Sequence, residues 1–175
     1  MEIPQDIKEM LEPDEKILWC DKPLRAPFVR RSIGLVFIGI PWLVFPLIII
    51  GMASTKFLFE PPVLLFLIFW YGILGFIFFW TPIYSSLVWK NIYYVLTNKR
   101  IIIRKGLVGI DYDVLNLDAI QQVNVNVGFW DRKYGTGTLT IQAIGVRPIT
   151  LYAVKEPRKV YEIINRASRT RKYST

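Results

Sequence analysis

Two long stretches without a charged side chain constrain this sequence more than any other feature. They cover residues 32–55 and residues 61–89, with Lys56 and Glu60 between them. A helix needs about 20 apolar residues to cross a bilayer core of about 30 Å, and both stretches are long enough. The alternative is a pair of buried core helices, but such helices rarely run this far without a charge. The pattern predicts a transmembrane helical hairpin over residues 33–89, with spans at about 33–53 and 62–82 and a helical extension toward Trp89.

Two prolines, Pro41 and Pro46, lie inside the first predicted span. Each removes one helix hydrogen bond, which predicts a bend or loosened turn there. Membrane helices tolerate such a break when neighbouring groups satisfy the freed carbonyls. Neither span contains Asp, Glu, Lys or Arg, which argues against an ion pathway, a proton relay or a transporter. The connecting loop, residues 54–62, is short and predicts a tight antiparallel hairpin.

The distribution of Lys and Arg predicts the orientation of the hairpin. Basic residues flank the two spans on the side of the termini, whereas the loop carries Lys56; they are Arg25, Arg30, Arg31, Lys90, Lys99 and Arg100. The positive-inside rule therefore predicts a multi-pass protein of the cell (inner, cytoplasmic) membrane with both termini in the cytoplasm. Arg30, Arg31 and Trp89 are the candidate membrane-interface anchors. The first 25 residues are acidic and polar and predict no cleaved signal peptide.

The remaining charge and the rare residue types exclude several classes of protein. Residues 90–175 carry fifteen Lys or Arg and six Asp or Glu, so almost all of the net charge of +8 lies there. The chain has no histidine, which removes most acid–base triads and catalytic zinc sites. Its single cysteine, Cys20, cannot form an internal disulfide, and is expected to be a small strand residue. We therefore predict a protein without enzymatic activity, cofactor or metal.

Residues 92–154 show the alternation and glycine spacing of β-strands. The runs 92–97 and 100–104 flank Asn98-Lys99, which predicts a hairpin. Further strands are predicted at 113–117, 123–127, 139–144 and 149–153. Together they predict an antiparallel meander of five to seven strands.

A helical period follows the last predicted strand. Pro157 suits the first turn of a helix, and the apolar residues that share one face are Val160, Ile163, Ile164 and Ala167. The expected organisation is an N-terminal cytoplasmic segment over 1–32 that could pack on the β domain, the hairpin over 33–89, a cytoplasmic domain over 90–170, and a frayed tail over 171–175.

The sequence resembles the bacterial pleckstrin-homology-like (PH-like) family. Residues 94–106 are similar to its first hairpin, which carries a leucine-Thr-Asn-x-Arg motif, here Leu96 to Arg100, followed by a glycine. The similarity continues through 117–123 and 134–139 to the closing helix. Residues 11–19 resemble the opening that precedes two membrane spans in membrane-bound members. The resemblance implies a mainly-β split barrel of two roughly orthogonal antiparallel sheets, capped by a C-terminal α-helix, and no enzymatic activity.

Two functions fit this organisation. The first is a non-catalytic scaffold or assembly module at the cytoplasmic membrane face, whose strand edges bind a protein partner or further copies of the chain. The alternative is a module that senses or presents anionic lipid. Binding of nucleic acid is disfavoured because the basic residues are dispersed, and no small-molecule substrate is expected.

Seven basic residues are candidate contacts to anionic lipid headgroups, at about 1 kcal/mol each near the surface: Lys90, Lys99, Arg100, Arg104, Lys105, Arg132 and Lys133. The alternative, favoured here, is a topology signal with nonspecific lipid contact. The short Asn98-Lys99 turn argues against an inositol phosphate site, because eukaryotic PH domains use a longer first loop for that purpose.

Three other features have simpler structural interpretations. The glycine-rich stretch 131–137 is predicted to be a turn rather than a phosphate cradle, because it lacks the P-loop spacing. Phe129 and Trp130 are expected to pack in the core or against the helical hairpin rather than dip into the membrane interface. The acidic residues Asp111, Asp113, Asp118 and Asp131 match no calcium loop and are expected in solvated turns.

Overall fold

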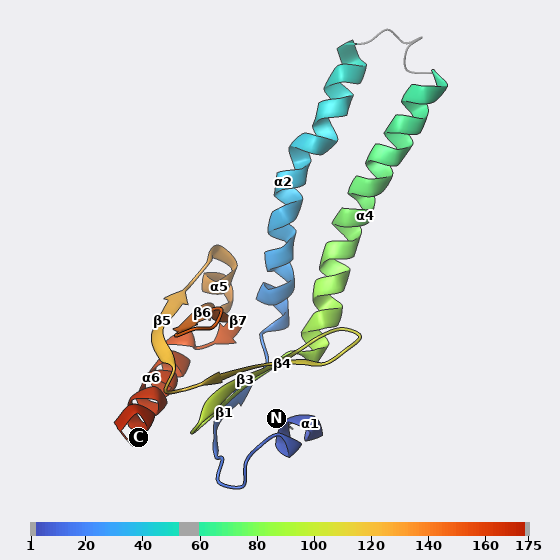
Figure 1. Cartoon of the computed structure of the whole chain (residues 1–175). Coiled ribbons are helices and arrows are strands. Elements are labelled where there is room, and N and C mark those ends of the chain that lie inside the picture. Colours follow the sequence, from blue (N-terminus) through green and yellow to red (C-terminus); the bar gives the residue numbers. More distant parts are fainter. Residues whose placement is uncertain (1–2, 53–59, 174–175) are drawn as a thin grey trace. The chain divides into compact units, whose positions relative to one another are not determined.

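The computed structural model describes residues 3–52 and 60–173, and the chain divides into two compact units (Figure 1). We call Met1–Phe28 together with Leu87–Thr175 the β unit, and Val29–Ser86 the helical unit. The N-terminal segment, expected as a separate part over 1–32, is therefore grouped with the β domain up to Phe28.

Two long helices account for the uncharged stretches. They are α2 (Arg25–Met52) and α4 (Pro61–Asn91). α2 begins several residues before the predicted span, and α4 continues without interruption past Trp89, as the expected extension requires. Among the described residues, α4 is the one helix long and apolar enough to cross a membrane, with a mean hydropathy of 2.4, and the apolar part of α2 is the shorter run Gly39–Met52. Most of the predicted loop over 54–62, up to residue 59, lies outside the described residues.

Side chains of α4 satisfy backbone groups of α2 near its second proline. Pro46 has no N–H to donate to the carbonyl of Trp42, four residues earlier. The indole Nε1 of Trp70 donates to that carbonyl at 3.2 Å, and the hydroxyl of Tyr71 donates to the carbonyl of Leu43 at 3.1 Å. A side chain of α4 therefore binds the carbonyl that Pro46 leaves without its helix partner.

The β unit contains a four-stranded and a three-stranded antiparallel sheet. The first has the order β1 (Ile17–Asp21), β2 (Tyr93–Thr97), β3 (Arg100–Lys105) and β4 (Asp111–Asn116). The second has the order β5 (Ile120–Asn126), β6 (Thr136–Ala143) and β7 (Ile149–Lys155). The predicted runs of 92–154 all fall on these strands, so the expected antiparallel meander is confirmed.

The N-terminal segment supplies the first strand, β1, so the hairpin expected to be the first of the fold is not the first. β1 pairs with β2, so Tyr94–Gly106 supplies the second and third strands and not the first hairpin. The first connection of the fold is the whole of residues 22–92, which contains both long helices. Asn98-Lys99 is therefore the second connection and not the first, so its shortness does not bear on an inositol phosphate site in the first loop.

The helix α6 (Pro157–Tyr173) covers the core as its period predicts. Val160 and Ile164 are buried with residues of both sheets, and Ile163 and Ala167 pack against the same cluster. α6 continues to Tyr173, so the tail predicted from residue 171 was wrong over its first three residues.

A second, smaller core attaches the N-terminal segment to the outer face of the first sheet. Ile7 of α1 (Gln5–Glu9) is fully buried against Val95 and Ile102. The expected packing of this segment on the β domain is confirmed. A backbone hydrogen bond from Leu24 to Ala153 on β7, 2.9 Å long, joins the chain after β1 to the second sheet.

Candidate functional site

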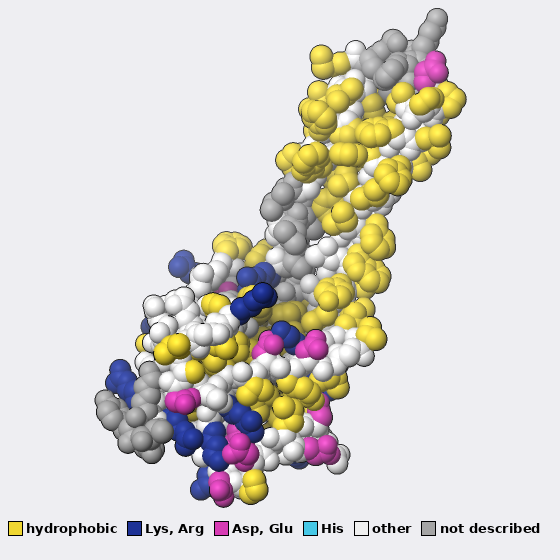
Figure 2. All heavy atoms as spheres, in the orientation of Figure 1, with side chains coloured by type: hydrophobic (Ala, Val, Ile, Leu, Met, Phe, Trp, Pro, Cys, Tyr) yellow, Lys and Arg dark blue, Asp and Glu magenta, His cyan; other side chains and the backbone are white. Residues whose placement is uncertain are grey.

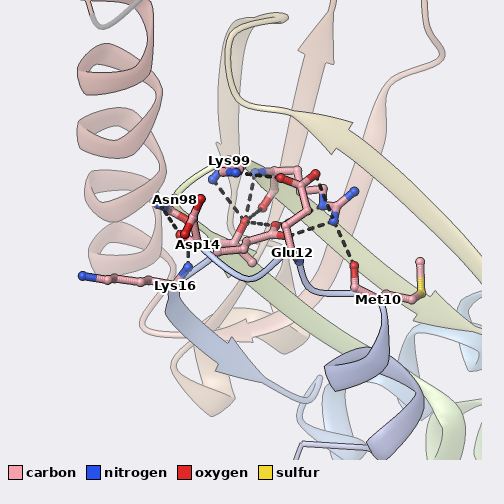
Figure 3. A network of polar contacts seen from close by, with 9 residues as sticks. Met10, Glu12, Asp14, Lys16, Asn98 and Lys99 are labelled. Atoms are coloured by element: carbon pink, nitrogen blue, oxygen red, sulfur yellow. Dashed lines mark hydrogen bonds and ion pairs between the residues drawn. The ribbon is translucent and has the colours of Figure 1, made fainter.

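The motif from Leu96 to Arg100 forms the β2–β3 turn and binds the N-terminal segment (Figure 3). The backbone N–H of Asn98 donates to the carbonyl of Lys16 at 3.0 Å, and the side-chain oxygen of Asn98 accepts the N–H of Lys16 at 2.8 Å. The hydroxyl of Thr97 accepts the backbone N–H groups of Lys99 and Arg100 at 3.2 and 3.0 Å. The Thr and Asn of the motif therefore shape the turn and hold the chain that enters β1.

A buried ion pair joins the same turn to the N-terminal segment. The side chain of Glu15 is fully buried, and Arg100 contacts both of its oxygens, with Nε–Oε1 at 3.0 Å and Nη2–Oε2 at 2.8 Å. Glu15 also accepts the hydroxyl of Thr97 at 2.6 Å and the N–H of Glu12 at 3.1 Å, and Arg100 donates to the carbonyl of Met10 at 3.0 Å. The pair is thus bidentate with its remaining polar groups satisfied, which is the arrangement that makes a buried charge tolerable.

Three more basic residues of the predicted lipid-contact set also pair with carboxylates. Lys99 Nζ lies 2.6 Å from Glu12, Arg104 Nε lies 2.6 Å from Asp6, and Lys105 Nζ lies 2.5 Å from Asp113. Tyr112 also donates its hydroxyl to Asp6. Lys99, Arg100 and Arg104 thus hold the N-terminal segment, and we name these contacts, together with Glu12, Glu15 and Asp6, the acid–base clamp.

The clamp shifts the pKa values of its members in consistent directions. Burial would raise the pKa of Glu15, but the hydrogen bonds from Arg100 and Thr97 outweigh it, so the pKa lies below its usual value. The pKa of Asp6 is lowered in the same way, against its burial, by hydrogen bonds from Tyr112 and Arg104. The hydrogen bond to Asp6 in turn raises the pKa of Tyr112. The carboxylates of the clamp are therefore ionised at neutral pH.

Trp89, a predicted interface anchor, makes its polar contact inside the β unit. Its indole Nε1 donates to the carbonyl of Pro23 at 2.6 Å. The ammonium of Lys22 lies 4.0 Å from the ring centroid of Tyr93 and donates to the carbonyl of Lys90 at 3.0 Å. These cation–π and hydrogen-bond contacts tie the segment that follows β1 to the segment that precedes β2. The other predicted anchors, Arg30 and Arg31, lie within α2.

The remaining predicted basic residues do not belong to the clamp. Arg132 and Lys133 are exposed on α5 (Phe129–Tyr134), a short helix that replaces most of the turn predicted over 131–137. Gly135 ends this helix in the left-handed region, with φ at 64°. The prediction of a turn was therefore wrong up to Tyr134, because Asp131 accepts the N–H of Gly128 at 3.2 Å and caps the helix.

Of the two packing sites expected for Phe129, the core was wrong. Its side chain is 81% exposed, and it packs edge-to-face on the partly buried Trp130 with ring centroids 5.2 Å apart.

Among the described residues, no three acidic or cysteine side chains lie close enough to hold a metal ion. Cys20 lies in β1, as expected, and burial raises the pKa of its thiol.

A polar groove of about 890 Å³ lies beside the clamp, where α1 meets the end of α4. Two exposed lysines line it, Lys8 and Lys90, together with Arg104 and one acid, Glu9. The clamp carboxylates Asp6, Glu12 and Glu15 form their ion pairs with Lys99, Arg100 and Arg104, and not with either of these lysines. Lys90 had been predicted from the sequence, but Lys8 had not, because the N-terminal segment is acidic overall.

The opposite charges of two segments of the sequence could have predicted the acid–base clamp. Residues 1–32 contain seven acidic residues, and residues 99–105 contain four basic ones. The sequence-based prediction gave the acidic residues of 1–32 no partner and assigned the basic residues of 99–105 to membrane topology and lipid contact, because the pairing of β1 with β2 was not foreseen.

Comparison with known proteins identifies the family. The model of the family described as Bacterial PH domain matches residues 24–168, and the chain belongs to this family. Among solved structures, a DUF1696 family protein with a pleckstrin-homology domain from Shewanella loihica PV-4 is 20% identical, with 44% of this chain and 70% of that chain covered and a TM-score of 0.37. No curated protein matches the chain. PH domains commonly bind lipids or proteins, so the β unit is a PH-like domain of a kind suited to either role.

Removing Arg100 is expected to destabilise the β unit strongly. Arg100→Ala leaves the carboxylate of Glu15 buried without its cation, which costs about 3 kcal/mol of unfolding free energy. Thermal or denaturant unfolding of the full chain in detergent measures this loss. Lys159→Ala is the matched control, because its ion pair with Glu156 is exposed, with side chains 71% and 61% accessible. Equal effects of the two substitutions would contradict the role of the clamp.

Acid is expected to weaken the same contacts. Because the folded pKa of Glu15 is below its usual value of 4.5, its contribution is complete above that value and is lost as the pH falls through the folded value. The unfolding free energy of the native chain should therefore fall as the pH drops below about 4.5. Glu15→Gln should reduce this dependence, as measured by unfolding at a series of pH values. A dependence unchanged by the substitution would show that Glu15 is not linked to stability.

Proposed function

We propose that this chain is an integral protein of the cytoplasmic membrane in which α2 and α4 both span the bilayer. The PH-like domain then lies on the cytoplasmic side, as a non-catalytic module that binds a protein partner or further copies of the chain. The observation that carries this proposal is the surface of α4.

α4 is far too apolar for a helix in contact with water. It has 31 residues, and none of them is buried although its mean hydropathy reaches 2.4. Large apolar side chains such as Leu65, Phe69 and Phe79 are 68–75% exposed. Figure 2 shows apolar side chains along the visible face of the helical unit. Exposed apolar surface of this extent is expected only where lipid or another protein covers it.

The pairing of β1 with β2 supports a second span. Both ends of residues 22–92 belong to neighbouring strands of one sheet, so the connection must return to the side that it left. If α4 crosses the bilayer, α2 must therefore cross it too. The hydrogen bonds from Trp70 and Tyr71 to α2 support this arrangement, because backbone groups inside a bilayer must find partners within the protein. The positive-inside rule favours cytoplasmic termini.

A protein-binding role is supported by apolar side chains that the β unit leaves uncovered. Val108 is fully exposed, Phe129 is 81% exposed and Ile144 is 67% exposed, all on connections between strands. The absence of histidine from the sequence agrees with a role in binding rather than catalysis.

The membrane proposal predicts a definite pattern of cysteine labelling. In the Cys20→Ser background, Glu60→Cys is expected to react with a membrane-impermeant maleimide on intact cells, whereas Arg132→Cys should react only after permeabilisation. The full chain should also remain in the membrane during alkaline carbonate extraction. Labelling of both positions on intact cells, or release by carbonate, would refute the two-span arrangement.

Binding of anionic lipid is a second candidate function, and the polar groove favours it. Lys8 and Lys90 face a common groove next to the end of α4, where a headgroup would lie if α4 spans the bilayer.

Native mass spectrometry of the full chain in detergent tests this alternative. The native chain should retain phosphatidylglycerol in preference to phosphatidylcholine. The double variant Lys8→Glu/Lys90→Glu should lose this preference, whereas Arg132→Glu/Lys133→Glu on α5 should keep it. If both double variants behave alike, the groove is not the lipid site.

A further inference from the structure

The outer edge of β5 is an unoccupied strand edge. β5 pairs with β6 on one side, from Ile120 to Asn126. Among the described residues, the backbone of Gln122–Asn126 makes no hydrogen bond beyond that ladder. Because alternate residues of an edge strand direct their N–H and C=O groups outward, this edge offers a row of unpaired donors and acceptors.

This edge lacks the features with which proteins usually block strand pairing. Residues 119–130 contain no charged residue and no proline. The other sheet edges differ: β4 carries Asp111 and Asp113, β1 ends in Asp21, and β7 is joined to Leu24 by a backbone hydrogen bond. Charges and covering segments of this kind protect edges from association, so β5 is the edge left open to a partner.

The side chains of β5 are suited to a copy of themselves. Gln122, Asn124 and Asn126 are exposed on one face, where the amide of Gln122 donates to Asn124 at 2.8 Å. An amide group both donates and accepts, so amides of two copies can bind each other. On the other face Val123 packs on the core, while Val125 and Val127 are 37% and 45% exposed.

We propose that β5 pairs antiparallel with β5 of a second copy of this chain, about a two-fold axis close to Asn124. The two sheets then form one continuous six-stranded sheet, in which Asn124 faces its counterpart and Gln122 faces Asn126 of the other copy. Amides meet amides and valines meet valines, so no like charges are opposed, although residues 90–175 are strongly basic. A partner recognised through charge would find no complementary group on this edge.

The proposal rests on the proposed function, because one strand pair is small for a stable interface in solution. Anchoring in a membrane confines copies to two dimensions and raises their effective concentration. Pairing is therefore expected for the full chain in liposomes and is expected to weaken on dilution in detergent.

Cysteine cross-linking of the full chain in liposomes tests the register. In the Cys20→Ser background, oxidation of Asn124→Cys should give a disulfide-linked dimer. Gln142→Cys is the matched control: it is exposed and lies opposite Gln122, but on the central strand β6. Two sheets joined at β5 keep the Gln142 positions about three strand spacings apart, so dimer should be at least about fivefold more abundant for Asn124→Cys. Equal yields would overturn the proposal.

Substitutions of opposite charge at Asn124 distinguish a loss of β5 pairing from misfolding of the chain. Fluorescently labelled Asn124→Lys copies should lose energy transfer among themselves, as should Asn124→Glu copies, and an equal mixture of the two should recover it. Energy transfer that persists in the lysine variant, or that fails to return in the mixture, would refute the β5 interface. If carbonate extraction shows no membrane insertion while the cross-link still forms, the proposed function fails and the interface stands. If the chain inserts in the membrane but the cross-link does not form, the β5 interface fails and the membrane part of the proposed function stands.

Discussion

The pairing of β1 with β2 is the contact on which the rest of the structure depends. It brings residues 17–21 beside residues 93–97, and everything between them becomes one connection of the sheet. The buried pair of Glu15 and Arg100 lies at one end of these strands, and the contacts of Lys22 and Trp89 lie at the other. Polar contacts therefore close both ends of the strand pair, while Val95 and Ile102 provide the apolar surface on which α1 packs.

This arrangement gives the polar motif from Leu96 to Arg100 a physical role without a ligand. A threonine, an asparagine and an arginine around a tight turn resemble a binding site when only their chemistry is considered. In the structure Thr97 and Asn98 bind backbone groups of the turn and of the entering chain, and Arg100 neutralises a buried carboxylate. The basic residues left for an external partner are consequently fewer than the net charge of the chain suggests.

Much of the fold could be predicted because it depends on local periodicity. The alternation in β5 and the helical period of α6 are properties of single segments, and both elements form where they were expected. The clamp could not be predicted in this way, because Glu15 and Arg100 are far apart in sequence and their contact requires β1 to lie beside β2. The burial of Phe129 could not be predicted for a similar reason: it depends on what the start of α5 faces, and there the side chain of Phe129 is 81% exposed.

The insertion of two long helices between adjacent strands also governs the order in which this protein can mature. β1 leaves the ribosome before α2 and α4, and its partner β2 leaves after them. The first sheet therefore cannot be completed during synthesis until the helical pair has been made. A chain whose helices failed to return would leave unpaired both β1 and the edge of β2 that faces β1. Closing so long a loop would be entropically unfavourable for a flexible chain, and two paired helices reduce that cost by bringing its ends together. The return of the helical unit is thus a condition for adding β1 to the first sheet of the β unit.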